Sequence, residues 1–212
     1  MDISIHRINT VAGLRSIPVE FGTEIDIRAD GSALILNHEP FIGGERFIDY
    51  LSEYQHGLLI LNIKEAGIED EVLRLVRERG IPRFFLLDVE FPYIFKASRR
   101  SERAIAMRYS EEESIETVIR YREKVDWVWI DTITRLPLDL ETVDVLKGFK
   151  TCLVCPERWG RLRDISPYTK AMHTIGFRPA AVMTSMRGAK DWLQFDETLC
   201  GHTKQQGGVV NT

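Results

Sequence analysis

The chain has 212 residues and a formal net charge of −4, and 44% of its residues are hydrophobic. This length favours a single domain without excluding a second, and the negative charge argues against a general nucleic-acid binder. Apolar runs such as 58–61 and 84–87 are far too short to span a membrane, and the N-terminus lacks the features of a signal peptide. We therefore expect a soluble, cytoplasmic protein. The sequence leaves its oligomeric state open, and a homo-oligomer is one possibility.

Short apolar runs alternate with helical patterns from one end of the chain to the other. Eight runs are expected to form strands: 3–8, 23–28, 58–64, 84–89, 104–109, 127–132, 151–155 and 180–184. A further run, 33–37, follows Asp30-Gly31, which is a strong hairpin signal.

Four of the intervening helices have end signals. The helix at 68–79 has three acidic residues in its first turn and a glycine just after its end. Ser110 to Glu113 reads as a capping box. Asp139 caps a helix that ends at Gly148, and Ser166-Pro167 opens another that ends at Gly176.

Eight strands that are mostly separated by helices predict a closed (β/α)8 TIM barrel that occupies residues 1–200 as one domain. Because such barrels need at least about 200 residues, some helices must be short or missing, and 91–103 is a candidate connection. A doubly wound open sheet is the alternative, but no glycine-rich phosphate loop follows the first strand. Residues 201–212 are polar and glycine-rich, and we expect them to form a flexible tail.

Four ionisable side chains lie at or near the ends of the first apolar runs: His6, Glu24, Asp26 and His38. The two carboxylates are two residues apart, so on a strand they point to the same face. Two acids that could hold a hard metal ion and two histidines that could move protons are the components of a metal-assisted phosphodiester cleavage site.

The alternation of side chains along the strands brings more polar groups to this site. In a barrel, functional side chains lie at the C-terminal ends of the strands. Alternation directs Glu24, Asp26, Asn62 and Lys64 to the barrel mouth, together with His6, while the isoleucines between them face the helices. His38, at the end of the hairpin, can reach over the same mouth.

The first 40 residues resemble those of the glycerophosphodiester phosphodiesterases and the wider phosphatidylinositol-phospholipase-C-like barrels. His6-Arg7 matches the opening His-Arg dipeptide of the family. The family's Glu-x-Asp strand, Asp-Gly turn and histidine-terminated strand appear as 24–26, 30–31 and 34–38, and 182–185 is similar to its final strand. After residue 65 the resemblance depends mainly on the order of strands and helices.

This resemblance implies a role for each residue of the site. Glu24 and Asp26 would bind Mg²⁺ or Ca²⁺, and Arg7 or Lys64 would hold the phosphate of a small glycerol- or sugar-linked phosphodiester. One of the two histidines, His6 and His38, would act as a base and the other as an acid, in an order that the sequence leaves open. In the family, a hydroxyl group of the substrate commonly attacks first and gives a cyclic phosphate.

The sequence departs from the family pattern at the third metal carboxylate. This position, two residues before Lys64, is Asn62, whose amide oxygen can ligate a metal ion but brings no charge. Glu90 is the expected additional ligand, with Glu65 and Asp131 as other possible substitutes. The departure keeps a second hypothesis open, in which a catalytically weakened barrel binds a phosphorylated metabolite. A lyase or transferase acting on another phosphate ester is a third.

Overall fold

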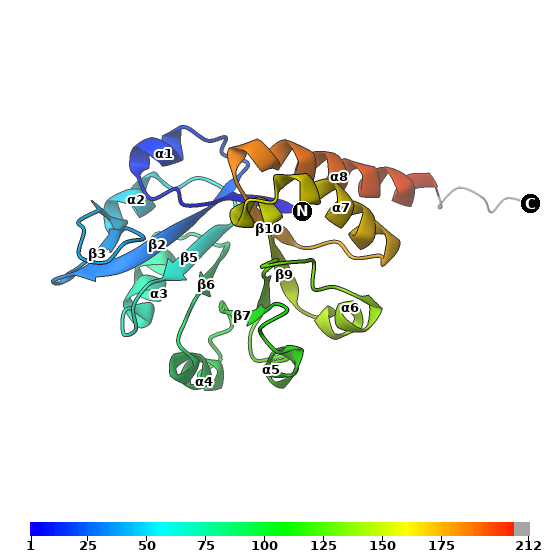
Figure 1. Ribbon diagram of the computed structural model, residues 1–212. Helices are drawn as coiled ribbons and strands as arrows, with labels where there is room; N and C mark the ends of the chain where they lie inside the picture. Colours follow the sequence, from blue (N-terminus) through cyan, green and yellow to red (C-terminus); the bar gives the residue numbers. More distant parts are fainter. Residues whose placement is uncertain (206–212) are drawn as a thin grey trace, which may run out of the picture.

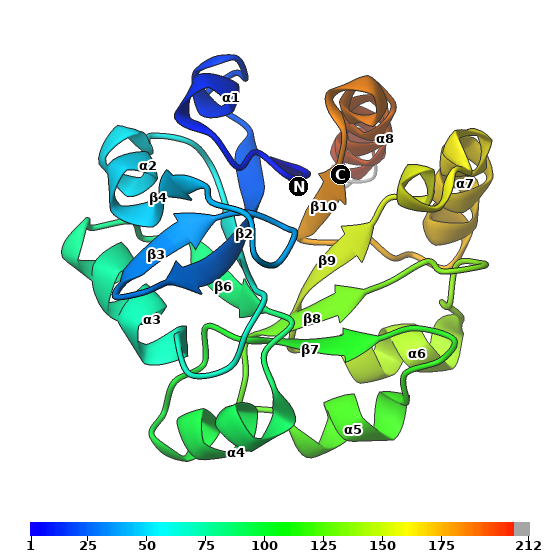
Figure 2. The same cartoon turned by 60° about the vertical axis from the view of Figure 1, so that its left-hand side comes forward.

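The computed structural model of the chain describes residues 1–205, of which 197–205 are described only as backbone. Helices lie outside the strands in two views of the molecule (Figure 1, Figure 2). The strands are β1 (Asp2–Ile5), β2 (Gly22–Asp30), β3 (Ala33–Leu36), β4 (Glu45–Arg46), β5 (Leu59–Ile63), β6 (Phe84–Leu87), β7 (Ala106–Tyr109), β8 (Trp127–Ile130), β9 (Lys150–Val154) and β10 (Ala181–Thr184). The helices are α1 (Val11–Arg15), α2 (Phe47–Glu53), α3 (Glu69–Glu78), α4 (Phe91–Arg99), α5 (Ile115–Arg120), α6 (Leu140–Leu146), α7 (Ile165–Thr174) and α8 (Met186–Gln205), with 3-10 turns η1 (Pro156–Trp159) and η2 (Leu162–Asp164).

All eight predicted strands form, and they pair in parallel, which confirms the predicted α/β class. Parallel ladders join β1 to β2, β2 to β5 and β5 to β6, and a second series joins β7, β8, β9, β10 and β1. The segment that precedes β7 meets β6 at a single parallel bridge between Leu86 and Ile105. The predicted hairpin also forms, as the antiparallel pair of β2 and β3, and β4 extends it.

Two separate apolar layers flank the parallel strands. The larger lies between strands and helices and includes Ile25 and Ile27 of β2. The smaller, which we name the inner layer, consists of residues on the opposite face of the strands. Among them are Phe85 and Trp127, whose ring centroids are 4.5 Å apart. Successive strand residues point to opposite faces. Because Ile25 and Ile27 point to the helices, Glu24 and Asp26 point to the opposite face of β2.

Two local predictions about the helices need correction. Residues 91–103 contain α4, because Pro92 suits a first helical turn and Ile94 and Ala97 bury one face against the core. The short helices are instead α1 and α5, with five and six residues. The N-cap of α5 is Ser114, whose hydroxyl accepts a hydrogen bond from the N–H of Glu116, whereas Ser110 forms a turn before the helix.

The last helix extends into the segment that was predicted to be a polar tail. Helix α8 continues to Gln205, so residues 201–205 are helical, while residues 206–212 of that predicted tail lie outside the described residues. In the part of the chain that the structure describes, no helix combines the length and hydropathy that crossing a bilayer requires.

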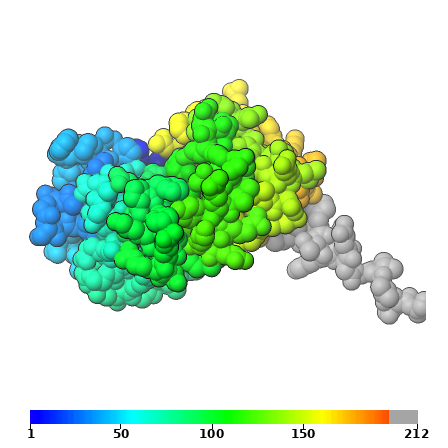
Figure 3. Space-filling model, turned by 90° about the horizontal axis from the view of Figure 1, so that it is seen from below, coloured from blue at the N-terminus to red at the C-terminus, as the bar shows by residue number. Residues whose placement is uncertain are grey.

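From below, the cyan and green part of the chain, which contains α3, α4 and α5, forms a continuous packed surface (Figure 3).

We predict that Phe85→Ala will lower the free energy of unfolding by about 3–5 kcal/mol, because Phe85 is fully buried in the inner layer and its removal leaves a cavity. Urea denaturation of both proteins measures the difference. The exposed Val19→Ala serves as a control and should change stability by less than about 0.5 kcal/mol. A loss below about 1 kcal/mol for Phe85→Ala would contradict a tightly packed inner layer.

Candidate active site

A cavity of about 190 Å³ lies where the parallel strands end. Residues from or just after all eight of these strands, together with the hairpin and η1, contribute to its wall. The lining residues are His6, Arg7, Glu24, Asp26, His38, Asn62, Lys64, Leu87, Asp88, Arg108, Trp129, Asp131, Val154, Arg158, Trp159 and Met183.

Seven of the eight predicted site residues line this cavity, and Glu90 does not. Glu90 is exposed and is the N-cap of α4, where its carbonyl oxygen accepts hydrogen bonds from the N–H groups of Tyr93 and Ile94. The acidic residue that β6 supplies to the cavity is Asp88, directly after the strand, with a positive φ of 56°. Glu65, the other nearby substitute, accepts a hydrogen bond from the N–H of Ala29 outside this cavity.

The two carboxylates of β2 are buried and held by specific donors. Glu24 is 2% exposed and accepts hydrogen bonds from the backbone N–H of Arg7 and from the Asn62 amide, both at 2.8 Å. Asp26 is fully buried and accepts one from the Asn9 amide at 2.8 Å. Burial and the neighbouring Asp26 raise the pKa of Glu24 to about 7, so this pair carries less than two negative charges near neutral pH.

The two histidines lie in different surroundings. His6 follows β1, and its Nε2 is 3.9 Å from Oε2 of Glu24. Burial, and then the charges of Arg158 and Arg7, lower the pKa of His6 to about 4, so its imidazole is neutral at pH 7 and can accept a proton. The Nδ1 atom of His38 is 2.6 Å from a carboxylate oxygen of Glu39, which orients the ring.

Positive side chains and further acids form a connected network across the mouth. Lys64 Nζ lies 3.2 Å from Asp26 and 3.6 Å from Asp88. The guanidinium of Arg108 forms ion pairs with Asp88, at 2.6 Å, and with Asp131, at 3.1 Å. The network thus places the positive side chains of Lys64 and Arg108 beside the carboxylates and holds these side chains in position.

Sequence reasoning missed Arg108 and Arg158 as site residues. The signal for Arg108 was available, since Ala106 belongs to the inner layer and a residue two positions later shares its face. Arg158 lies on the 3-10 turn after β9, and no strand or helix periodicity in the sequence predicts its direction.

Three buried polar atoms that belong to lining residues have no hydrogen-bond partner among the described residues: Asp26 Oδ1, Asn62 Oδ1 and Trp129 Nε1. Lys64 approaches Asp26 Oδ1, but as an ion pair and not in hydrogen-bond geometry. Asp26 and Asn62 are register partners on β2 and β5, so their side chains are neighbours. Two acceptor oxygens without donors, beside the Glu24 carboxylate, fit a hard divalent cation.

The donor set for such a cation is nevertheless sparse. In the described part of the chain, no cluster of three or more His, Cys, Asp or Glu residues could hold a metal ion. The set is therefore two carboxylates, Glu24 and Asp26, completed by the neutral amide oxygen of Asn62. Because the affinity of calcium sites rises with the number of charged ligands, this set suits a weakly bound ion.

Comparison with solved structures bears on the fold. The chain is similar to a protein assigned as a glycerophosphoryl diester phosphodiesterase from Agrobacterium tumefaciens strain C58, with a TM-score of 0.65 and 11% identity over 94% of this chain and 99% of that one. The chain shares the fold of the glycerophosphodiester phosphodiesterases. A glycerophosphodiester phosphodiesterase from the same strain gives a TM-score of 0.59 with 12% identity, covering 87% of this chain and 96% of the other.

A third structure agrees with these two. The glycerophosphoryl diester phosphodiesterase from Parabacteroides distasonis ATCC 8503 gives a TM-score of 0.60 with 12% identity, over 90% of this chain and 85% of that one. No protein-family model matches the sequence, and no curated protein matches it significantly. The resemblance predicted from the first 40 residues is thus confirmed at the level of the fold.

We predict that Glu24→Gln will gain stability relative to the native protein as the pH rises from 5 to 8. The pKa of Glu24 is about 7 in the folded state and near 4.5 in the unfolded chain, so the folded state retains a proton between these values. The protonated Glu24 side chain therefore stabilises the native protein at low pH, and this stabilisation is lost as the pH rises towards 7. The glutamine side chain of the variant does not titrate, so the variant does not lose it.

Urea denaturation in EDTA at the two pH values measures this effect. The difference between variant and native protein should change by about 1–3 kcal/mol. The exposed Glu20→Gln provides the matched control and should show no such change. A Glu24→Gln difference that is independent of pH would contradict the raised pKa.

Proposed function

We propose that the protein is a metal-dependent phosphodiesterase of the glycerophosphodiester type, which hydrolyses a small glycerol- or sugar-linked phosphodiester. The observation that carries this proposal is one cavity in which His6 and His38 accompany the buried carboxylates Glu24 and Asp26. The shared fold supports the same class of reaction.

We further infer that the eight parallel strands close into the (β/α)8 barrel that the sequence predicts. Seven parallel ladders link neighbouring strands, and the eighth neighbour contact consists of the bridge between Leu86 and Ile105. The N–H of Leu86 also donates a hydrogen bond to the carbonyl oxygen of Ala104 at 2.8 Å. The separate inner apolar layer supports closure, because the interior of such a barrel is filled by side chains.

In the proposed site, Glu24, Asp26 and Asn62 would hold Mg²⁺ or Ca²⁺. Such an ion, when bound, supplies neutralisation of the charge that develops on the phosphate. Arg7 and Lys64 would bind the phosphate oxygens, since both line the cavity and lie within 4 Å of Asp26. Trp129 would donate its unpaired indole N–H to another phosphate oxygen, because that group can only donate.

We assign the two proton transfers to His6 and His38. One imidazole would take the proton from a hydroxyl group of the substrate as its oxygen forms a bond to phosphorus. The bond from phosphorus to the leaving alcohol breaks as the other histidine donates a proton to that oxygen. Water then opens the cyclic phosphate with the two proton transfers reversed.

We predict that His6→Ala and His38→Ala will each lower kcat for a glycerophosphodiester by about 10²–10⁴-fold, which is the usual contribution of acid–base catalysis. Steady-state assays with glycerophosphocholine in Mg²⁺ or Ca²⁺ measure the change. The control is His173→Ala on α7, outside the cavity, which should retain native activity. Native activity in His6→Ala would overturn the assignment.

A second candidate function is supported by Asn62. With only two carboxylates available for a cation, the barrel could bind a phosphorylated metabolite through Arg7, Lys64 and Arg158 without efficient catalysis. Calorimetry separates the two functions. Heat of binding at millimolar Mg²⁺ or Ca²⁺ supports the enzyme, whereas its absence, together with tight binding of a phosphorylated sugar, supports the binding protein.

We predict that Asn62→Asp will lower the metal concentration for half-maximal activity about tenfold, because a third negative charge strengthens the site for a divalent cation. The same change should destabilise the metal-free protein, since the new charge is buried beside Glu24 and Asp26. Metal titrations of activity and of thermal stability test both effects. A half-maximal concentration that does not change would argue against a metal ion bound at Asn62.

A further inference from the structure

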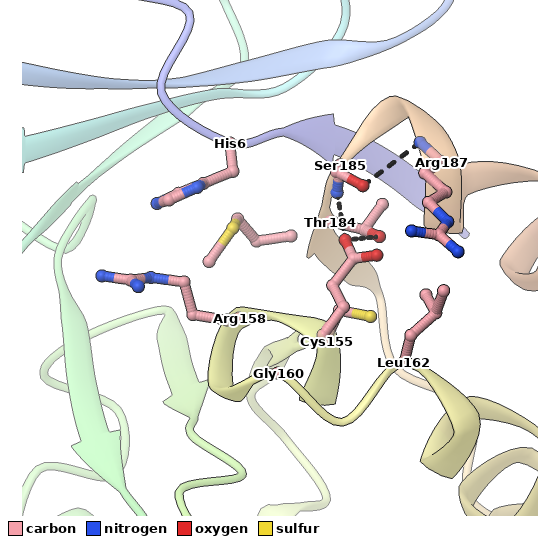
Figure 4. A pocket seen from close by; sticks show the side chains of 10 residues that line it. His6, Cys155, Arg158, Gly160, Leu162, Thr184, Ser185 and Arg187 are labelled. Carbon is pink, nitrogen blue, oxygen red and sulfur yellow. Dashed lines mark hydrogen bonds between the residues drawn. The ribbon is translucent and has the colours of Figure 1, made fainter.

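A second cavity, of about 430 Å³, adjoins the proposed catalytic cavity, and the two share the lining residues His6, Arg158 and Met183. It lies between the segments that follow β9 and β10 (Figure 4). A phosphodiester whose phosphate occupies the first cavity can therefore place its alcohol group in the second.

One carboxylate, that of Glu157 on η1, lines this second cavity and is held in place. Its Oε1 accepts hydrogen bonds from the hydroxyl of Thr184, at 2.7 Å, and from the N–H of Ser185. Gly188 makes room for the other oxygen, because a Cβ at that position would lie 2.6 Å from Oε2. Oε2 makes no hydrogen bond or ion pair with the described residues, so it remains available to a ligand.

Two arginines stand on either side of this carboxylate. Figure 4 shows His6 and Arg158 on one side of the cavity and Arg187 on the other, with Thr184 and Ser185, the partners of Glu157, between them. Both arginines are exposed, and neither forms an ion pair with any described residue. Across the cavity the order of charges is therefore positive, negative, positive.

We propose that the alcohol part of the substrate carries both an ammonium and a carboxylate group, as in a serine-linked phosphodiester. The proposal rests on the proposed phosphodiesterase function. In such a molecule the ammonium and the carboxylate branch from the same carbon, one methylene group away from the phosphate oxygen, so the phosphate, ammonium and carboxylate can face Arg158, Glu157 and Arg187 respectively. An alcohol with only an anionic group would face Glu157 without a counter-charge, and one with only an ammonium group would leave Arg187 without a partner.

The test compares glycerophosphoserine, glycerophosphoethanolamine and glycerophosphoglycerol as substrates. We expect the highest kcat/KM for the serine diester, by about tenfold over the ethanolamine diester, with the glycerol diester lowest. Arg187→Gln should raise KM about tenfold for the serine diester alone. Glu157→Gln should raise KM for both ammonium-containing diesters and not for the glycerol diester.

The matched control is Arg163→Gln, an exposed arginine on η2 that does not line this cavity and should affect none of the three substrates. Equal kcat/KM for the three diesters, or an equal effect of Arg187→Gln on all of them, would overturn the proposal.

The catalytic function and the second cavity's specificity can fail separately. If none of the diesters is hydrolysed, calorimetry compares O-phosphoserine with phosphoethanolamine on native protein and on Arg187→Gln. Tighter binding of O-phosphoserine that Arg187→Gln abolishes supports the specificity even in a protein without hydrolytic activity. Equal binding of the two ligands, or no binding of either, overturns it.

Discussion

Burying Glu24 and Asp26 side by side on β2 costs free energy, because each carboxylate loses water and faces another negative group. The surrounding structure offsets this cost with two hydrogen-bond donors and one positive charge. Arg7 supplies its backbone N–H from the turn after β1, Asn62 supplies an amide from β5, and Lys64 supplies a positive charge at the end of the same strand. These contacts hold the buried pair in place.

The same electrostatic constraint extends around the mouth. Lys64 is shared between Asp26 and Asp88, Arg108 joins Asp88 to Asp131, and Asp131 accepts a hydrogen bond from the Trp159 indole at 2.9 Å. This chain of contacts links residues that lie on or after six different strands, β2, β5, β6, β7, β8 and β9. These linked ion pairs and hydrogen bonds hold one wall of the cavity together.

The opposite wall is less committed to internal contacts. Arg158 and Arg187 have no ion-pair partner among the described residues. Glu157 uses one carboxylate oxygen to hold the start of α8, while the other makes no hydrogen bond or ion pair with the described residues. In TIM barrels, the segments after the last two strands often bind anionic groups of the ligand. The proposed catalytic carboxylates therefore lie beside the connected wall, and the groups proposed to discriminate between substrates lie on the opposite one.

The sequence by itself determined which residues of each strand face the site, because side-chain alternation is a local property of the backbone. This was enough to bring His6, Glu24, Asp26, Asn62 and Lys64 together. The resemblance to the family, and not the alternation, identified Asn62 as the departure from its pattern. Only the tertiary structure decided that Asp88 lines the cavity in place of Glu90, since a positive φ after β6 and the start of α4 redirect the chain there. It alone also decided the positions of Arg158, Glu157 and Arg187, because contacts between separate loops depend on how the strands assemble and leave no periodic pattern in the sequence.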